Sequence, residues 1–177
     1  MSTTVLLAGR RPDPLDSDAR RFPVENVLLV RERLRDLFAE RRPDHLVCSA
    51  ACGADLLALD VAGDLDIRRH VVLPFSIATF RETSVTDRPG HWGPLFDRLV
   101  SEIEARADLT VLSESPGDDA AYAATNDQLQ SVAKALGLDI LAVAVWDGEP
   151  RGDGDLTQHL IHTSAESGAD VVEVLTL

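Results

Sequence analysis

The alternation of short apolar runs with segments of helical periodicity constrains the fold of this chain more than any other feature. Apolar runs predict strands at 4–8, 45–48, 67–73, 109–112, 140–146 and 171–175. Between them, helical spacing predicts helices at 24–38, 54–62, 95–103, 118–136 and 156–167. Such alternation implies right-handed crossovers and a parallel sheet. We expect one α/β domain over 1–177: a doubly wound, mainly parallel, Rossmann-like sheet of about six strands with helices on both faces.

Composition excludes several classes of partner. The chain has 177 residues and a net charge of −13, which argues against nucleic acid and anionic membranes as partners. Its two cysteines are too few for a disulfide framework or a structural zinc site. No signal peptide and no apolar run of roughly 20 residues is found, so we expect a cytoplasmic protein. Separately, we expect it to hold no metal and no cofactor.

The loops after the strands are the places to look for a ligand site, because doubly wound sheets bind ligands beyond the carboxyl ends of their strands. The turn at 49–55 is the most specific of them, since small residues lead directly into a helical pattern. Ser49 and the amides of Cys52, Gly53 and Ala54 are candidates for binding a phosphate, and Asp55 for binding a ribose hydroxyl. Ordinary strand–turn–helix packing explains the same pattern.

Three further loops supply candidates. Gly9 and Arg10 follow the first strand, where the arginine suits a phosphate or carboxylate, although solvated arginines after a strand-ending glycine look the same. Tyr122 and Asn126 share a helix face and suit a nucleobase, or a half-buried packing position. A second glycine-rich loop contributes Asp147 and Gly148, and also Gly154 and Thr157. Its acidic residues favour a sugar, a cationic group or a metal over a highly charged phosphate.

The segment 80–92 shows neither helical nor strand periodicity, and we expect it to be irregular. Glu82, within it, is the candidate catalytic carboxylate, although a lone glutamate there is more often structural or solvated. His159 and His162 lie three residues apart but lack a third metal ligand, which favours surface histidines.

Taken in order, the motifs resemble those of the SLOG superfamily, which groups DprA-like and "lonely guy"-like Rossmannoid nucleotide-binding proteins. The residues that carry the resemblance are Gly9-Arg10, Ser49-x-x-Cys52-Gly53-Ala54-Asp55, Leu73-Pro74-Phe75, Phe80, Glu82-x-Ser84-Val85, Tyr122-x-x-x-Asn126, Trp146-Asp147-Gly148 and Gly152-x-Gly154. The resemblance implies a nucleotide-derived ligand in the crevice between these loops. Enzymes of the superfamily use a Pro-Gly-Gly-x-Gly-Thr-x-x-Glu motif, whereas this chain has acidic residues between its glycines and no glutamate at that spacing.

Three functional hypotheses remain. The first is a stand-alone domain that binds or senses a small nucleotide-derived molecule, with a second copy of the chain or an effector protein as its partner. The second is a hydrolase that cleaves the N-glycosidic bond of a nucleoside or nucleotide, for which Glu82 is the catalytic candidate. The third is an interaction protein whose pocket is vestigial.

Overall fold

The strands and helices follow the predicted alternation. In the computed structural model, which describes residues 2–137 and 139–177, the strands are β1 (Thr3–Gly9), β2 (His45–Cys48), β3 (Arg68–Leu73), β4 (Leu109–Val111), β5 (Asp139–Trp146) and β6 (Asp170–Leu175). The helices are the short 3-10 helix η1 (Val24–Asn26), α1 (Val27–Arg41), α2 (Ala54–Asp64), α3 (Ile77–Ser84), α4 (Trp92–Glu104), α5 (Asp119–Leu136) and α6 (Leu156–Glu166). Most predicted boundaries lie within one to three residues of these.

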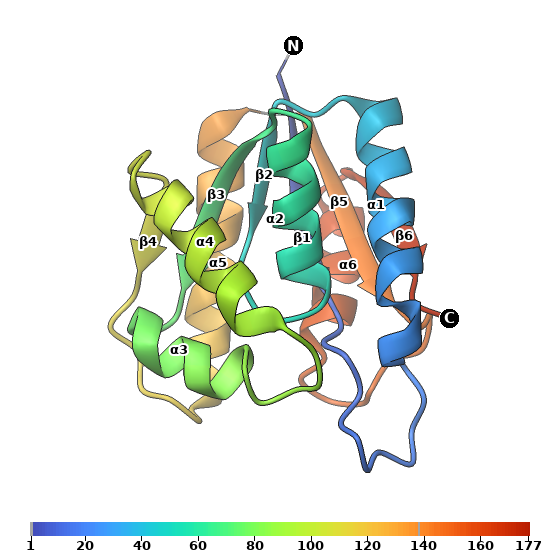
Figure 1. The fold of residues 1–177 in the computed structure, drawn as a ribbon. Helices are drawn as coiled ribbons and strands as arrows, with labels where there is room; N and C mark the ends of the chain where they lie inside the picture. Colours follow the sequence, from blue (N-terminus) through green and yellow to red (C-terminus); the bar gives the residue numbers. More distant parts are fainter. Residues whose placement is uncertain (1, 138) are drawn as a thin grey trace.

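The six strands form one parallel sheet in the order β4-β3-β2-β1-β5-β6 (Figure 1). The predicted fold class, a parallel Rossmann-like sheet of six strands, is therefore confirmed. From β1 the chain proceeds outward to β4 and then returns to the other side of β1 to form β5. This reversal makes the carboxyl ends of β1 and β5 the switch point of the sheet, where ligands of such folds bind.

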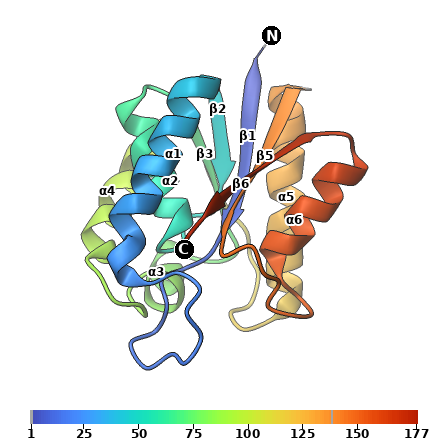
Figure 2. The same cartoon turned by 90° about the vertical axis from the view of Figure 1, so that its right-hand side faces the viewer.

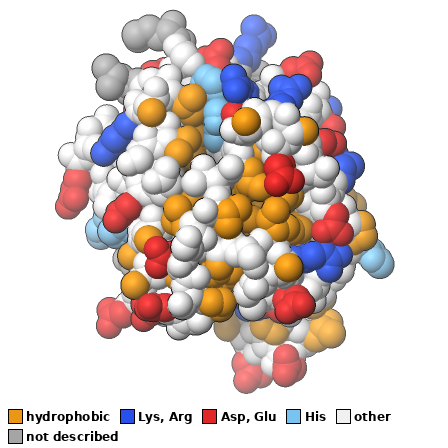
Figure 3. Space-filling model, turned by 90° about the vertical axis from the view of Figure 1, so that its left-hand side faces the viewer, with side chains coloured by type: hydrophobic (Ala, Val, Ile, Leu, Met, Phe, Trp, Pro, Cys, Tyr) orange, Lys and Arg blue, Asp and Glu red, His pale blue; other side chains and the backbone are white. Residues whose placement is uncertain are grey.

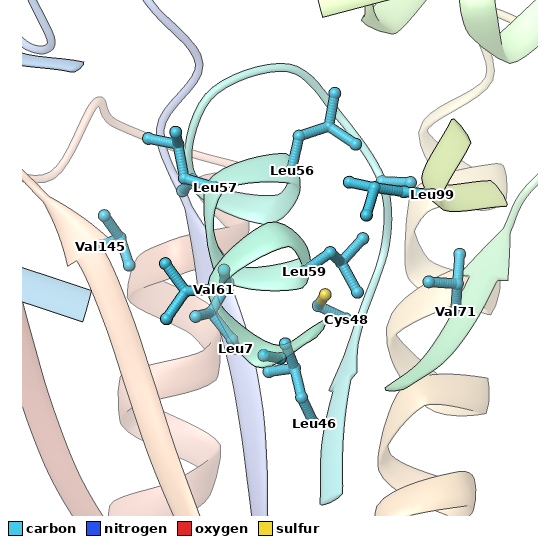
Figure 4. Packing of buried hydrophobic residues seen from close by; sticks show 14 of the residues in the cluster. Leu7, Leu46, Cys48, Leu56, Leu57, Leu59, Val61, Val71, Leu99 and Val145 are labelled. Carbon is cyan, nitrogen blue, oxygen red and sulfur yellow. The ribbon is translucent and has the colours of Figure 1, made fainter. Parts of the chain in front are cut away.

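Two hydrophobic clusters cover the two faces of the sheet. The larger lies under α1, α2 and α4, and the smaller under α5 and α6 (Figure 2). Strand alternation assigns the side chains: in β1, Leu7 faces the first cluster and Leu6 the second. Four residues of α2 (Leu56, Leu57, Leu59 and Val61) pack against the strands and α4, so this helix is buried on most of its circumference (Figure 4).

The expectation of an irregular segment at 80–92 is wrong for residues 80–84, which belong to α3. The helix begins at a serine cap, because the Ser76 hydroxyl accepts a hydrogen bond from the Thr79 amide at 3.3 Å. Phe80 then anchors it between Phe75 and Phe96, with ring centroids 5.9 and 6.1 Å away. The helix has only 8 residues, too few to show a clear apolar period in the sequence.

The β4 side of the molecule is one of the two edges of the sheet. Figure 3 shows hydrophobic side chains gathered across the middle of this face, with acidic side chains around them. Val111 of β4 is 44% exposed. Within the ranges that the structure describes, every helix is too short or too polar to span a bilayer.

Candidate functional site

A cavity of about 350 Å³ opens at the carboxyl edge of the sheet, next to the switch point. The ends of β1, β2 and β3 form its floor, and α3 and the first turns of α5 and α6 form its walls. Seven of the residues predicted from the sequence line it: Gly9, Ser49, Asp55, Tyr122, Asn126, Gly154 and Thr157. Segments far apart in the chain thus contribute to one cavity.

Other predicted residues do not line this cavity, namely Arg10, Cys52, Gly53, Ala54, Glu82, Asp147 and Gly148. Glu82 is exposed on α3, whereas Phe80 and Ser84 of the same helix line the cavity. Two residues along a helix point in nearly opposite directions, so Glu82 faces solvent. The structure therefore gives Glu82 no contact with the cavity.

Arg10 is held by the protein itself. Its guanidinium is 2% exposed and donates to Asp147 at 3.1 Å, to Asp155 at 2.8 Å and to the Glu149 carbonyl at 2.7 Å. It also lies 5.5 Å from the centroid of the Trp146 ring. These contacts tie the end of β1 to the loop after β5 and leave the guanidinium no free face for a ligand.

Asp155 completes this network at the start of α6. Its side chain caps the helix by accepting hydrogen bonds from the amides of Thr157 at 3.1 Å and Gln158 at 3.4 Å. Burial acts to raise its pKa, but the hydrogen bonds from Arg10 and from the Arg151 amide lower the pKa to about 2. The N-terminus of α6 is therefore occupied by a carboxylate of the protein.

Two of the three amides of the turn before α2 are paired within the protein, which corrects the expectation that Cys52 and Ala54 are open to a phosphate. The Cys52 amide donates to the Ser84 carbonyl at 2.9 Å, and the Ala54 amide donates to the Arg10 carbonyl at 3.1 Å. A Cβ on Gly53, whose φ is +90°, would lie 2.7 Å from the same Arg10 carbonyl. The small residues of this turn thus serve close packing of two loops rather than access for a ligand.

Cavity residues that the sequence analysis missed include two cations, Arg11 and Arg151. Arg11 donates to both oxygens of Asp87, at 2.9 and 2.8 Å. Arg10 and Arg11 are neighbours of the same type, so the sequence carries no signal for which of them the turn at Gly9 directs inward. The cavity also has apolar walls, formed by Pro74, Phe80 and Leu156 among others.

Tyr122 and Asn126 lie on one face of α5, as predicted. Tyr122 is 37% exposed, an unusual position for a large ring, and both residues line the cavity. A half-exposed aromatic ring beside an amide offers one apolar surface and both a donor and an acceptor to a planar heterocycle.

Asp55 is the buried carboxyl of the cavity, with 9% of its surface exposed. Its Oδ2 accepts a hydrogen bond from the Ala51 amide at 3.1 Å. Burial raises its pKa from 3.8 to about 7, and Ala51 and Arg11 only partly oppose this. The dipole of α2 also favours the ionised form, but by at most about 2 kcal/mol. Because a rise from 3.8 to about 7 corresponds to about 4 kcal/mol, burial dominates.

The two cysteines behind the turn, Cys48 and Cys52, are free and buried. Burial raises the pKa of Cys48 well above its ordinary value and that of Cys52 to about 12. Both are therefore thiols at neutral pH and are unsuited to nucleophilic chemistry, which needs the thiolate.

A second hollow, of about 640 Å³, adjoins the cavity along α5 and α6 and shares Tyr122, Asn126 and Gly154 with it. Its remaining lining is largely acidic or histidine, with Asp127, Asp153, Asp155, His159 and His162. In the part of the chain that is described, no group of three or more His, Cys, Asp or Glu side chains is arranged to hold a metal ion.

Comparisons with known proteins add one likeness. No family model and no curated protein matches the chain. Among solved structures, this chain aligns with DNA processing protein A (DprA) from Streptococcus pneumoniae, with 18% identity and a TM-score of 0.44, over 97% of this chain and 58% of that one. This alignment thus names the same kind of protein as the sequence resemblance, as a likeness and no more. At this identity and TM-score, it says nothing about what this chain binds or does.

Proposed function

We propose that this chain binds a small nucleotide-derived molecule in the cavity at the carboxyl edge of its sheet. The convergence of Ser49, Tyr122 and Asn126 on one cavity carries this proposal, because Ser49 comes from the loop after β2 and the other two come from α5. A volume of about 350 Å³ lies within the range of pockets for small ligands. Its lining of apolar walls with a few polar groups is typical of such pockets.

Different lining residues of the cavity suit different parts of a nucleotide. Tyr122 stacks on the base and Asn126 bonds to its edge. Ser49, Arg11 and Arg151 bind the phosphate, because they are the cavity's hydroxyl donor on the β2 side and its two cations. Arg10 is not part of this proposal, since buried carboxylates already neutralise it.

Binding is proposed here rather than hydrolysis. The hydrolase hypothesis assigned catalysis to Glu82, which is exposed and lies outside the cavity lining. A general acid or nucleophile has to reach the bond that breaks, and Glu82 does not face this cavity.

Isothermal titration calorimetry with nucleosides, nucleoside monophosphates and dinucleotides tests the proposal. We expect at least one of these compounds to bind, and Tyr122→Ala to weaken that binding by about tenfold or more, as loss of a stacking ring does. Asn126→Ala should weaken it similarly by removing hydrogen bonds to the base.

Gln128→Ala is the matched control, because it removes an amide from the same helix at a position outside the cavity. It should leave affinity unchanged. The proposal is overturned if no compound of the panel binds at millimolar concentration, or if Tyr122→Ala and Gln128→Ala behave alike.

A further inference from the structure

The carboxyl of Asp55 uses only part of its hydrogen-bonding capacity within the protein. Oδ2 accepts a hydrogen bond from the Ala51 amide, and among the described residues this is the one hydrogen bond that the side chain makes. A carboxylate can accept about four hydrogen bonds. Asp55 is 9% exposed and lines the cavity, so the unused capacity is directed to whatever occupies that space.

An ionised Asp55 would be poorly stabilised at this place. No arginine, lysine or histidine of the described chain forms an ion pair with it, and a buried charge without such a partner is strongly unfavourable. The neutral acid avoids that penalty, but its O–H then needs an acceptor. No described residue accepts it, so the O–H points to the cavity, where water or a ligand oxygen is the acceptor.

The charged groups that line the cavity with Asp55 indicate which ligand group it accepts, and among them Arg11 is the cation whose charge lowers the pKa of Asp55. Arg11, paired with Asp87, comes from the loop after β1, and Arg151 from the loop before α6. On the β2 side lies Cys48, which is a neutral thiol, and α5 contributes the exposed Asp119. The two cations attract an anionic group, whereas an ionised carboxyl beside it would repel that group.

We propose that Asp55 binds the ligand as a neutral carboxylic acid, donating a hydrogen bond from its O–H to a phosphoryl oxygen, so that binding takes up a proton. This inference rests on the proposed nucleotide-binding function. Because burial holds the pKa of Asp55 at about 7, both protonation states are populated near neutral pH, and the cavity then binds phosphate more weakly as pH rises.

The test uses the four common nucleoside 3′,5′-cyclic monophosphates, whose phosphodiester keeps one charge throughout the pH range, together with the four nucleosides. With a pKa of about 7, the neutral fraction of Asp55 falls about tenfold from pH 6 to pH 8, so affinity for the cyclic nucleotide should fall about tenfold. At pH 7, calorimetry in buffers of different ionisation enthalpy should show uptake of roughly half a proton for each ligand bound.

Asp55→Asn tests whether the Asp55 carboxyl causes the pH dependence, because the asparagine amide keeps a hydrogen-bond donor at every pH. It should bind the cyclic nucleotide equally at both pH values and take up no proton, whereas Asp119→Asn, which alters an exposed acid of the same cavity, should keep the tenfold dependence. If Asp55→Asn does not fold, an NMR titration of the ¹³C carboxyl resonances of aspartate in the wild type replaces it. Titration midpoints near or below 4 for every aspartate overturn the inference.

Affinity that is constant or rises between the two pH values in the wild type also overturns it, as does a pH dependence that survives in Asp55→Asn. If no cyclic nucleotide binds but nucleosides do, this inference fails and the proposed function stands. If neither class binds and the mononucleotides do not bind either, both fail.

Discussion

At the scale of single residues, two adjacent arginines have different environments. Arg10 is buried between Asp147 and Asp155, while Arg11 lines the cavity and pairs with Asp87 at the surface. The buried pair costs desolvation, but removing one partner is worse, because it leaves a charge without compensation in a water-poor site. Asp55 has no such partner, and burial raises its pKa to about 7, so part of the population is protonated at neutral pH.

Arg10→Met should destabilise the protein by about 3–5 kcal/mol, since it leaves the Asp155 carboxylate buried without its cation. Urea denaturation measures the change. Arg20→Met is the control, because Arg20 and Glu25 form a pair whose side chains are 65% and 63% exposed, and it should change stability by less than about 0.5 kcal/mol. Equal effects of the two substitutions would contradict the structural role given to Arg10.

Asp55→Asn should stabilise the protein at pH 8 by up to about 4 kcal/mol and have little effect near pH 4. The pKa of Asp55 is 3.8 when exposed and about 7 in the fold, so the folded state holds more protons between these values. Wild-type stability therefore falls as pH rises from about 4 to about 7 and the contribution is flat above that. Denaturation curves of both proteins at several pH values check this, and a destabilised Asn variant at pH 8 would contradict it.

At the scale of elements, the turn into α2 shows how one glycine positions two loops. Gly53 has a φ of +90°, and its α-carbon faces the backbone of Arg10 and Arg11. This contact seats the loop after β1 against the start of α2, while Cys52 bonds to the end of α3. Three elements therefore meet beside the floor of the cavity.

Gly53→Ala should destabilise the protein by about 2–4 kcal/mol, because it combines a positive φ with a clash at 2.7 Å from the Arg10 carbonyl. Gly168→Ala has a similar φ of +77° but nothing within 4 Å of the new Cβ, so about 1 kcal/mol is expected from strain alone. Thermal unfolding of both variants compares them. A Gly53→Ala protein as stable as Gly168→Ala would show that the close packing is not required.

At the scale of the whole molecule, the net charge and the local charge of the cavity have opposite signs. A net charge of −13 makes the field around the protein negative, and the two cavity arginines provide only a local positive region. A small anion can be held there by short-range contacts, whereas a polyanion has to bring many phosphates close to an acidic surface.

We therefore expect no binding of single- or double-stranded DNA at physiological salt. Fluorescence anisotropy with labelled oligonucleotides measures this, and lowering the salt should not reveal tight binding, because few phosphates can be neutralised. Submicromolar affinity at about 0.15 M salt would contradict the charge argument.

The sequence by itself determined the architecture of this protein. Apolar runs of strand length alternate with amphipathic helices, and few topologies bury both, so the parallel sheet and the edge at which the cavity opens follow from patterning. The positions of Ser49, Tyr122 and Asn126 at one cavity follow from the same logic, because each lies just beyond a strand or in the first turns of a helix. The 8-residue α3 escaped detection because its period is too short to recognise.

Only the tertiary structure decided which polar groups are free. The sequence does not show whether a hydrogen-bond donor bonds to a ligand or to another part of the protein. This holds for the guanidinium groups of Arg10 and Arg11 and for the amides of Cys52 and Ala54. Their partners, such as Asp155 and the Ser84 carbonyl, lie far away in the chain. Hydrogen bonds and ion pairs act over a few ångströms in space, so the packing of loops, and not the local pattern, fixes which donors remain for a ligand.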